Sequence, residues 1–329
     1  MLKESDFIKA ARSACLIWGL EPLQIDVISH SENIVCQVKV DSQRQVVMRL
    51  HRPGYNKLTE LDSEIAWVRS LAESGLPVPT AVQTPSGDYY RSIDIGSPDS
   101  FERRIVGVIE WVKGQPLGTP LTNNSNNVVA HYKKIGALAA AIRRHSNSWE
   151  RPIGFTRRRW DLNGLLGEDP LWGRFWEVTS LTKSQRSLFS EARTVLQNKL
   201  GELSTGPERF GLIHSDLHLG NIMNNDGALT IIDFDDAGYG WFAHEIAVAL
   251  HPGVGESWFD EAREAFLEGY CSVYEIELDE IASVDVFLTI RSLMIVGWLS
   301  DRPELPIYEH FPLVIRNAEQ AAEKFLVNR

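Results

Sequence analysis

Cysteine is scarce in this chain of 329 residues. The three cysteines, Cys15, Cys36 and Cys271, are odd in number and widely spaced. They provide neither a disulfide framework nor the closely spaced pairs of a structural zinc site, so we expect a reducing, cytoplasmic environment.

Basic charge and long apolar runs are lacking as well. The formal net charge of −11 argues against a general nucleic-acid binder, which would need a basic surface for phosphate contacts. The longest apolar stretch, residues 284–299, contains Asp285 and Arg291 and is too short to span a bilayer, so it predicts a buried helix and no membrane span. The first residues carry acids and no long apolar run, and we therefore expect no signal peptide.

What is present is the composition of a folded globular protein. Hydrophobic residues make up 43% of the chain and charged residues 23%, which excludes wholesale disorder. The length allows one large domain or two lobes with an ample core. The chain has no internal repeat and no low-complexity tract, so local motifs carry the information about its chemistry.

The most informative stretch is residues 214–236, in which polar residues stand at intervals beside two short apolar runs. The first apolar run, residues 210–213, is followed by His214 and Asp216, and Asn221 comes shortly after them. The second apolar run, residues 229–232, is followed by Asp233. The Asn-Asn-Asp-Gly sequence between the runs indicates a turn, because Asn and Gly tolerate positive φ. The stretch therefore predicts a hairpin-like unit that brings Asp216, Asn221 and Asp233 close together.

Such a group of side chains matches the needs of phosphoryl transfer. One carboxylate can accept a proton from the attacking hydroxyl, while an amide and a second carboxylate hold Mg²⁺ on the nucleotide phosphates. The His-x-Asp-x-x-x-x-Asn loop and the Ile-Asp-Phe segment resemble, in order and spacing, the aminoglycoside phosphotransferase, choline kinase and homoserine kinase-type superfamily. This resemblance implies that Asp216 is the catalytic base, that His214 is a structural member of the catalytic loop, and that Asn221 and Asp233 are Mg²⁺ ligands.

The rest of the chain agrees with the protein-kinase-like fold of that superfamily. Short β-branched runs at 34–40 and 46–50, followed by helical spacing over 59–74, predict a small antiparallel-sheet lobe. We place this nucleotide-binding lobe at residues 1–112. A Gly-Gln-Pro break follows, and the mainly helical remainder, residues 113–329, predicts a larger catalytic and acceptor-binding lobe. The predicted fold class is thus α+β with two lobes.

Two candidates for phosphate binding lie in the small lobe. Arg49 stands where the resemblance places a strand lysine that touches the α- and β-phosphates, and Glu64 stands where the family has the glutamate that pairs with this lysine. Arginine keeps the positive charge and can bind phosphate in a bidentate way, but its fork is wider than an ammonium group. An ordinary strand arginine is the alternative interpretation.

Two further segments are candidates for nucleotide contacts. The loop that contains Ser31 and Asn33 would cover the nucleotide, although it lacks the Gly-x-Gly-x-x-Gly pattern of protein kinases and is equally well a polar turn with no ligand. The segment 108–112 resembles the family's hinge, in which backbone groups of Glu110 to Val112 would read adenine. A plain central strand is the alternative for this segment.

Several other charged residues have structural interpretations beside functional ones. The Arg-Arg-Arg run at 157–159 is either a basic patch for an anionic substrate or a solvated face. Asp235 is either a metal or substrate ligand or an acid in a solvated or arginine-paired turn. Glu245 is interpreted as a helix-start or buried-pair acid.

We therefore expect a kinase that uses Mg²⁺ and ATP to phosphorylate a hydroxyl of a small molecule of the amino-alcohol, amino-acid, sugar or aminoglycoside type. The sequence does not decide between ATP and GTP, and it determines neither the acceptor nor the oligomeric state. Resemblance of the small lobe to bacterial stress-response kinases leaves a protein Ser/Thr kinase open, and Arg49 in place of lysine leaves a non-catalytic nucleotide-binding module open. A zinc hydrolase built on His214, Asp216 and His218 is the third alternative, but it would leave Asn221 unexplained.

Overall fold

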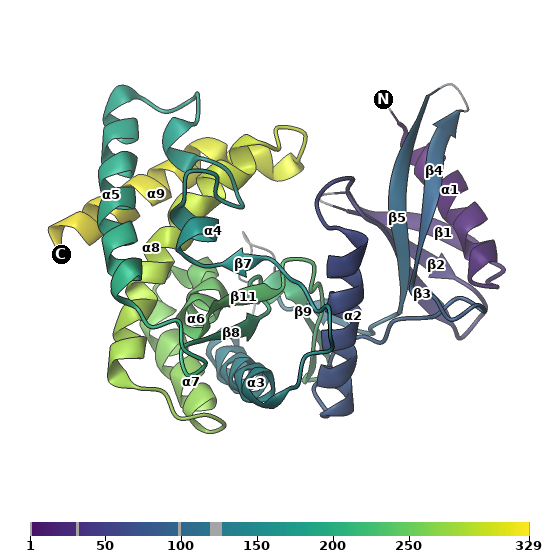
Figure 1. The fold of residues 1–329 in the computed structure, drawn as a ribbon, viewed down its shortest axis with the longest axis horizontal. Helices are drawn as coiled ribbons and strands as arrows, with labels where there is room; N and C mark the ends of the chain where they lie inside the picture. The colour runs from purple at the N-terminus through teal and green to yellow at the C-terminus, as the bar shows by residue number, and fades with distance from the viewer. Residues whose placement is uncertain (1, 31–32, 98–99, 119–126, 329) are drawn as a thin grey trace. The chain divides into compact units, whose positions relative to one another are not determined.

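The structure, a computed structural model, describes residues 2–30, 33–97, 100–118 and 127–328 (Figure 1). The residues form two compact units, each defined by the contacts among its own residues. Unit 1 consists of Met1–Gln115, Glu150–Arg157 and Met223–Asp235, and unit 2 of Pro116–Trp149, Arg158–Ile222 and Asp236–Arg329. The chain passes between the units several times, and the division expected at residue 112 stays a prediction about domains.

Unit 1 contains a five-stranded antiparallel sheet of order β1-β2-β3-β5-β4. Strands β2 and β3 alternate between buried and partly exposed positions, as the period of two requires. On β3, Val46, Met48 and Leu50 are fully buried in a core shared with helix α1, whereas Val47 and Arg49 are partly exposed. The side chain of Arg49 therefore lies on the opposite face of the sheet from this core. The strands are β1 Gln24–His30, β2 Ile34–Lys39, β3 Gln45–Leu50, β4 Tyr90–Ser97 and β5 Ser100–Glu110.

Two helices and a hairpin complete unit 1. Helix α1 spans Glu4–Ile17, and helix α2 spans Leu58–Glu73, where the spacing predicts a helix. Gly75, with φ 88°, follows the end of α2 because glycine adopts this left-handed conformation without strain. Strands β9, Ile222–Asn225, and β10, Ala228–Ile231, form a hairpin around the Asn-Asp-Gly turn, and β6, Gln115–Pro116, pairs with β9. The hairpin predicted between the apolar runs 210–213 and 229–232 is wrong in its first strand. The run Phe210–Ile213 is strand β8 and pairs with β11, Gly238–Trp241, because residues 222–225 form a strand of their own beside β10.

Unit 2 is mainly helical around a small sheet of order β7-β11-β8. Helix α5 begins with a capping box, in which the Thr182 hydroxyl accepts from Gln185 N at 3.2 Å and the Gln185 side chain accepts from Thr182 N at 3.0 Å. The elements are α3 Val128–Ser148, β7 Arg159–Trp160, α4 Leu162–Leu166, α5 Lys183–Glu202, β8 Phe210–Ile213, β11 Gly238–Trp241, α6 Phe242–Leu250, α7 Phe259–Cys271, α8 Leu278–Ser300 and α9 Phe311–Val327, with short 3-10 helices at Phe175–Glu177, Leu219–Asn221, His251–Gly253 and Pro306–His310.

Helix α8 is the apolar stretch that the sequence predicts to be a buried helix. In the described part of the chain it is the one helix long and apolar enough to cross a membrane by length and composition. However, 61% of its most apolar window is buried within the protein, and it packs against α6 and α9. The helix also carries the buried Arg291, so it has the character of a core helix.

Candidate active site

The turn after β8 carries Asp216 and is held by an acid from helix α6. Ser215 has a φ of 66°, which is uncommon for a residue with a side chain and is typical of functional turns. The N–H groups of His214 and Ser215 donate to the two carboxylate oxygens of Glu245 at 2.8 and 2.7 Å. Burial raises the pKa of Glu245 to about 7, although these two N–H groups act in the opposite direction. His214 is fully buried, and its Nδ1 accepts from Asp216 N at 3.2 Å, so both side chains order the loop.

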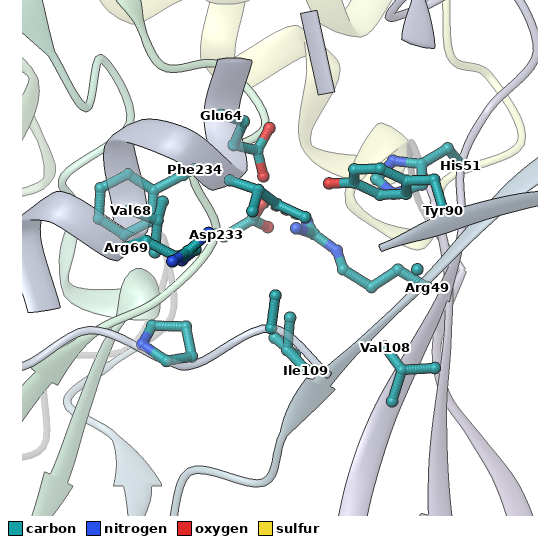
Figure 2. Close-up of a pocket in the computed structure, with 14 residues that line it drawn as sticks. Arg49, His51, Glu64, Val68, Arg69, Tyr90, Val108, Ile109, Asp233 and Phe234 are labelled. Carbon is teal, nitrogen blue, oxygen red and sulfur yellow. Dashed lines mark hydrogen bonds and ion pairs between the residues drawn. The ribbon is translucent and has the colours of Figure 1, made fainter. Parts of the chain in front are cut away.

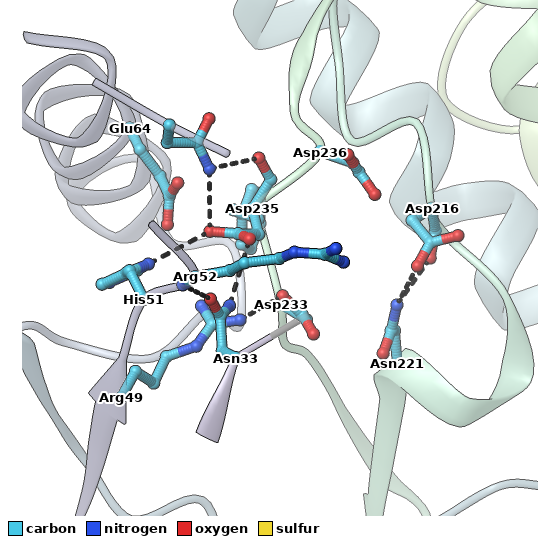
Figure 3. Close-up of polar contacts among 12 residues, drawn as sticks. Asn33, Arg49, His51, Arg52, Glu64, Asp216, Asn221, Asp233, Asp235 and Asp236 are labelled. Carbon is cyan, nitrogen blue, oxygen red and sulfur yellow. Dashed lines mark hydrogen bonds and ion pairs between the residues drawn. The ribbon is translucent and has the colours of Figure 1, made fainter. Parts of the chain in front are cut away.

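The carboxylate of Asp216 is contacted through both of its oxygens. Asn221 Nδ2 donates to Oδ2 at 2.9 Å (Figure 3). Arg291 Nη2 donates to Oδ1 at 2.6 Å. His218 accepts from Gly220 N through Nδ1, which leaves the ring proton on Nε2, 3.3 Å from Oδ2. Burial alone would raise the pKa of Asp216, but His218 and Arg291 lower it well below its ordinary value. The carboxylate is therefore ionised and able to accept a proton.

In unit 1, Asp233 follows strand β10 in a left-handed conformation. Its φ is 66°, which strains a residue with a β-carbon and is sustained only by its surroundings. The next residue, Phe234, is buried and packs edge-on against Trp67 of α2, with 5.7 Å between the ring centroids. Phe234 thereby anchors the segment, while the side chain of Asp233 is 43% exposed and accessible to a ligand.

Arg49 forms an ion pair with Asp233 at one wall of a pocket (Figure 2). Burial would lower the pKa of Arg49, but Asp233, Asp235 and Glu64 together raise it above its ordinary value, so the side chain stays charged. The pocket lies among α2, β3, β5 and the segment after β10. Its lining consists of Arg49, His51, Glu64, Ile65, Val68, Arg69, Pro79, Ala81, Tyr90, Gly107, Val108, Ile109, Asp233 and Phe234.

Glu64 lines the same pocket, but its ion pair is with Arg157 and not with Arg49. The distance from Arg157 Nη1 to Glu64 Oε2 is 3.3 Å, and both side chains are almost completely buried. Arg157 Nη2 also donates to the carbonyl oxygens of Phe234 at 3.1 Å and Asp235 at 2.8 Å. Arg157 is therefore neither a solvated arginine nor part of an exposed basic patch. It joins helix α2 to the segment that follows Asp233.

Asp235 is a buried acid with several donors around it. It accepts from Asn33 Nδ2 at 3.1 Å and Asn56 Nδ2 at 3.2 Å, and His51 Nδ1 lies 3.5 Å away (Figure 3). Burial would raise its pKa, but the contacts with His51, Arg49 and Asn33 lower it below its ordinary value. Asn33, whose Oδ1 also accepts from Arg52 N, is thus engaged inside unit 1, and Ser31 lies outside the described residues.

The segment expected to read adenine lies at the end of β5. Glu110 is the last residue of this strand; its N–H donates to Thr80 O at 2.8 Å, and its carboxylate pairs with Arg44 at 3.0 Å. Val112 follows the strand and is partly exposed. That backbone groups of Glu110 to Val112 bind adenine stays a prediction.

The structure therefore brings the predicted site residues together in two sets. Unit 2 holds His214, Asp216 and Asn221 in one hydrogen-bonded loop, and unit 1 holds Arg49, Glu64 and Asp233 around one pocket. The sequence did not assign supporting roles to Arg157 and Arg291. Glu245, which the sequence predicts to be a helix-start or buried-pair acid, lies buried in the first turn of α6. A signal existed for Arg291 in particular, because a charge in the middle of an apolar helix requires a buried partner.

Replacing Arg157 by methionine should destabilise the protein strongly. The change removes the ion-pair partner of the buried Glu64 carboxylate, and breaking such a pair costs about 3–5 kcal/mol in the free energy of unfolding. Arg159→Met is the matched control, because the half-exposed Arg159 pairs with Asp161 at the surface and such pairs contribute at most about 1 kcal/mol. Denaturant unfolding of both variants measures the difference. Equal losses in the two variants would contradict the buried role of Arg157.

Comparison with known proteins gives a consistent result. A model of the phosphotransferase enzyme family matches residues 25–285. Among curated proteins, an amicoumacin kinase of Bacillus subtilis is 25% identical over 292 residues, which cover 86% of this chain and 81% of that protein.

Solved structures extend the likeness over almost the whole chain. A microcompartment-associated aminopropanol kinase superposes with a TM-score of 0.83 at 28% identity, covering 98% of both chains. An amicoumacin kinase in complex with AMP-PNP, Ca²⁺ and Ami superposes with a TM-score of 0.78 at 21% identity, covering 98% of this chain and 94% of that one. The predicted α+β, protein-kinase-like fold is thereby confirmed.

Proposed function

The chain belongs to the phosphotransferase enzyme family, and on that basis we propose that it transfers the γ-phosphate of ATP to the hydroxyl of a small amino alcohol. The observation that carries the proposal is the loop after β8, where an ionised Asp216 is held by the amide of Asn221. The likeness to an aminopropanol kinase along nearly the full length of both chains supports an amino alcohol as the acceptor. The three free cysteines fit the cytoplasm as the compartment.

Asp216 acts as the general base in this proposal. The acceptor hydroxyl donates a hydrogen bond to its carboxylate, and the proton passes to that oxygen as the bond to phosphorus forms. His214 and Glu245 keep the loop in its conformation and do not touch the substrate. Most of the rate enhancement comes from placing the hydroxyl and the phosphate in line, because the transition state of phosphoryl transfer needs little covalent help from the protein.

Asn221 and Asp233 are the proposed ligands of Mg²⁺, and the side chains present fit such an ion. The amide nitrogen of Asn221 faces Asp216, which leaves the amide oxygen for a cation, and the carboxylate of Asp233 is 43% exposed. When bound, Mg²⁺ neutralises charge on the phosphate oxygens of ATP. The ion pair with Arg49 must give way when Asp233 binds the metal.

Arg49 then binds phosphate oxygens, for which its planar fork of donors is suited. Glu64 supports Arg49 by charge across the pocket, and Arg157 keeps Glu64 in place. The base of the nucleotide is read by the backbone of Glu110 and Val112.

An acceptor panel tests this function. The purified protein is incubated with Mg²⁺-ATP and, in turn, 1-aminopropan-2-ol, ethanolamine, choline, serine, a hexose, an aminoglycoside and a serine-containing peptide, while ADP release and the phosphorylated product are measured. We expect the highest kcat/KM with an amino alcohol. Phosphorylation of the peptide alone would replace the proposal with a protein kinase, and binding of ATP without any product would replace it with a non-catalytic nucleotide-binding module.

A further inference from the structure

We propose that Arg291, on the core helix α8, is a positioning residue for the carboxylate of Asp216. The inference deepens the proposed function, since it depends on Asp216 being the catalytic base. The contact joins residues that are 75 positions apart in the chain, so it reflects tertiary packing and not the local geometry of the loop.

The two oxygens of Asp216 are held by different elements. Oδ1 accepts from Arg291 Nη2 of α8 at 2.6 Å, whereas Oδ2 accepts from Asn221 Nδ2 of its own loop at 2.9 Å. A charge-assisted bond to arginine is shorter and stronger than a neutral one. Because one oxygen is held by each partner, the carboxylate plane cannot rotate without breaking a bond. The orientation of the proposed base therefore depends on Arg291.

The guanidinium of Arg291 is itself immobilised by packing. Arg291 is 6% exposed and lies over the ring of Trp172, with 4.3 Å between the guanidinium carbon and the ring centroid. Trp172 in turn packs edge-on against the fully buried Trp160, with 5.7 Å between the ring centroids. A stacked, buried guanidinium can therefore hold the carboxylate of Asp216 in one position.

Arg291 has no competing ion pair in the described part of the chain. Its Nη1 is buried without a hydrogen-bond partner among those residues, and its ion pair is with Asp216. Burying a guanidinium with incomplete hydrogen bonding is costly. The ion pair with Asp216 is therefore the main contact that offsets the cost of burying Arg291.

The chemistry of the base also favours a positioning role. A cation beside a carboxylate lowers its proton affinity, so Arg291 does not make Asp216 a stronger base. What Arg291 adds is the direction in which the carboxylate points, and small misplacements of reacting groups can reduce rates about 100-fold. Placement is also the main requirement of phosphoryl transfer.

The test uses Arg291→Met, Arg291→Lys and the control Arg302→Met. Arg302 is 8% exposed, stacks on Trp298 at 4.8 Å and donates to Trp298 O just beyond the end of α8, so it matches Arg291 in burial and stacking. With the acceptor found in the panel, we expect Arg291→Met to lower kcat about 100-fold while KM for ATP and the stabilisation by Mg²⁺-ATP stay unchanged. Arg291→Lys should recover much of kcat because lysine restores a cationic donor to Oδ1, and Arg302→Met should keep the wild-type kcat.

A double variant separates action through Asp216 from a general structural effect. If Arg291 acts through this carboxylate, then Arg291→Met should cause no further loss of kcat in an Asp216→Asn background. Additive losses, an unchanged kcat in Arg291→Met, or a rise in KM for ATP alone would overturn the inference. If Arg291→Met does not fold, the test is made with Arg291→Lys alone. A kcat as low as that of Asp216→Asn would then overturn the inference. Wild-type turnover in Asp216→Asn itself would instead refute the proposed function.

Discussion

Asp216→Asn should lower kcat about 10²–10⁴-fold, the range that general base catalysis contributes, and should leave the binding of Mg²⁺-ATP intact. Asparagine has the shape of aspartate, and its oxygen can still accept from Arg291, whereas the bond from Asn221 Nδ2 is lost because an amide nitrogen does not accept. What is lost is the ability to accept the proton of the acceptor hydroxyl. Steady-state turnover with the amino alcohol, together with the thermal shift caused by Mg²⁺-ATP, measures both parts of this prediction.

Asp226→Asn provides a matched control for this substitution. Asp226 lies in the exposed turn of the β9–β10 hairpin with a φ of 51°, a conformation that asparagine adopts readily. The control removes the same charge without touching the loop after β8, and it should retain wild-type kcat. Wild-type turnover in Asp216→Asn would show that another group accepts the proton, and a joint loss of nucleotide binding would show that Asp216 has a structural role.

Asp233→Asn should abolish both transfer and the stabilisation by Mg²⁺-nucleotide. A ligand that binds only the folded protein at about 100 times its Kd adds about 2.7 kcal/mol of stability, which gives a readily measured shift in Tm. The substitution removes the negative charge of a proposed metal ligand, so the metal-bound nucleotide loses a central contact. Thermal unfolding with Mg²⁺-ATP, Mg²⁺-GTP and Mg²⁺ alone compares the variant with the wild-type protein.

The same substitution also breaks the ion pair with Arg49, and this effect must be separated from metal binding. The Tm of the ligand-free variant measures the effect of losing this ion pair and is the baseline for the shift caused by nucleotide. The ion pair is not the sole contact of either side chain, because Asp233 is 43% exposed and Arg49 keeps the nearby charges of Asp235 and Glu64. A nucleotide-dependent rise in Tm that persists in Asp233→Asn would mean that the metal is bound elsewhere. Comparison of ATP with GTP in the wild-type protein identifies the preferred nucleotide.

Local spacing made the loop and the elements around it predictable. Asp216 and Asn221 stand in one short loop between two apolar runs, so the chain can bring their side chains together over a few residues, and the structure places them 2.9 Å apart. The capping box of α5 and the alternation along β3 are likewise local patterns, since each depends on neighbours within about one turn or one strand. Strand β1 was not among the predicted strands, because its exposed positions give it a weak alternation.

The family resemblance, the α+β fold and the residues most suited to phosphoryl transfer could therefore be predicted from the amino-acid order, because turn chemistry and periodic burial depend on neighbouring residues. Which charges meet depends on how distant elements pack: Arg157 pairs with Glu64, Arg49 with Asp233, and Arg291 with Asp216. Several arginines are available to each carboxylate, and nothing in their spacing ranks them. The choice is made by packing, which buries a charge only where an opposite charge or a set of donors from a distant element is within reach.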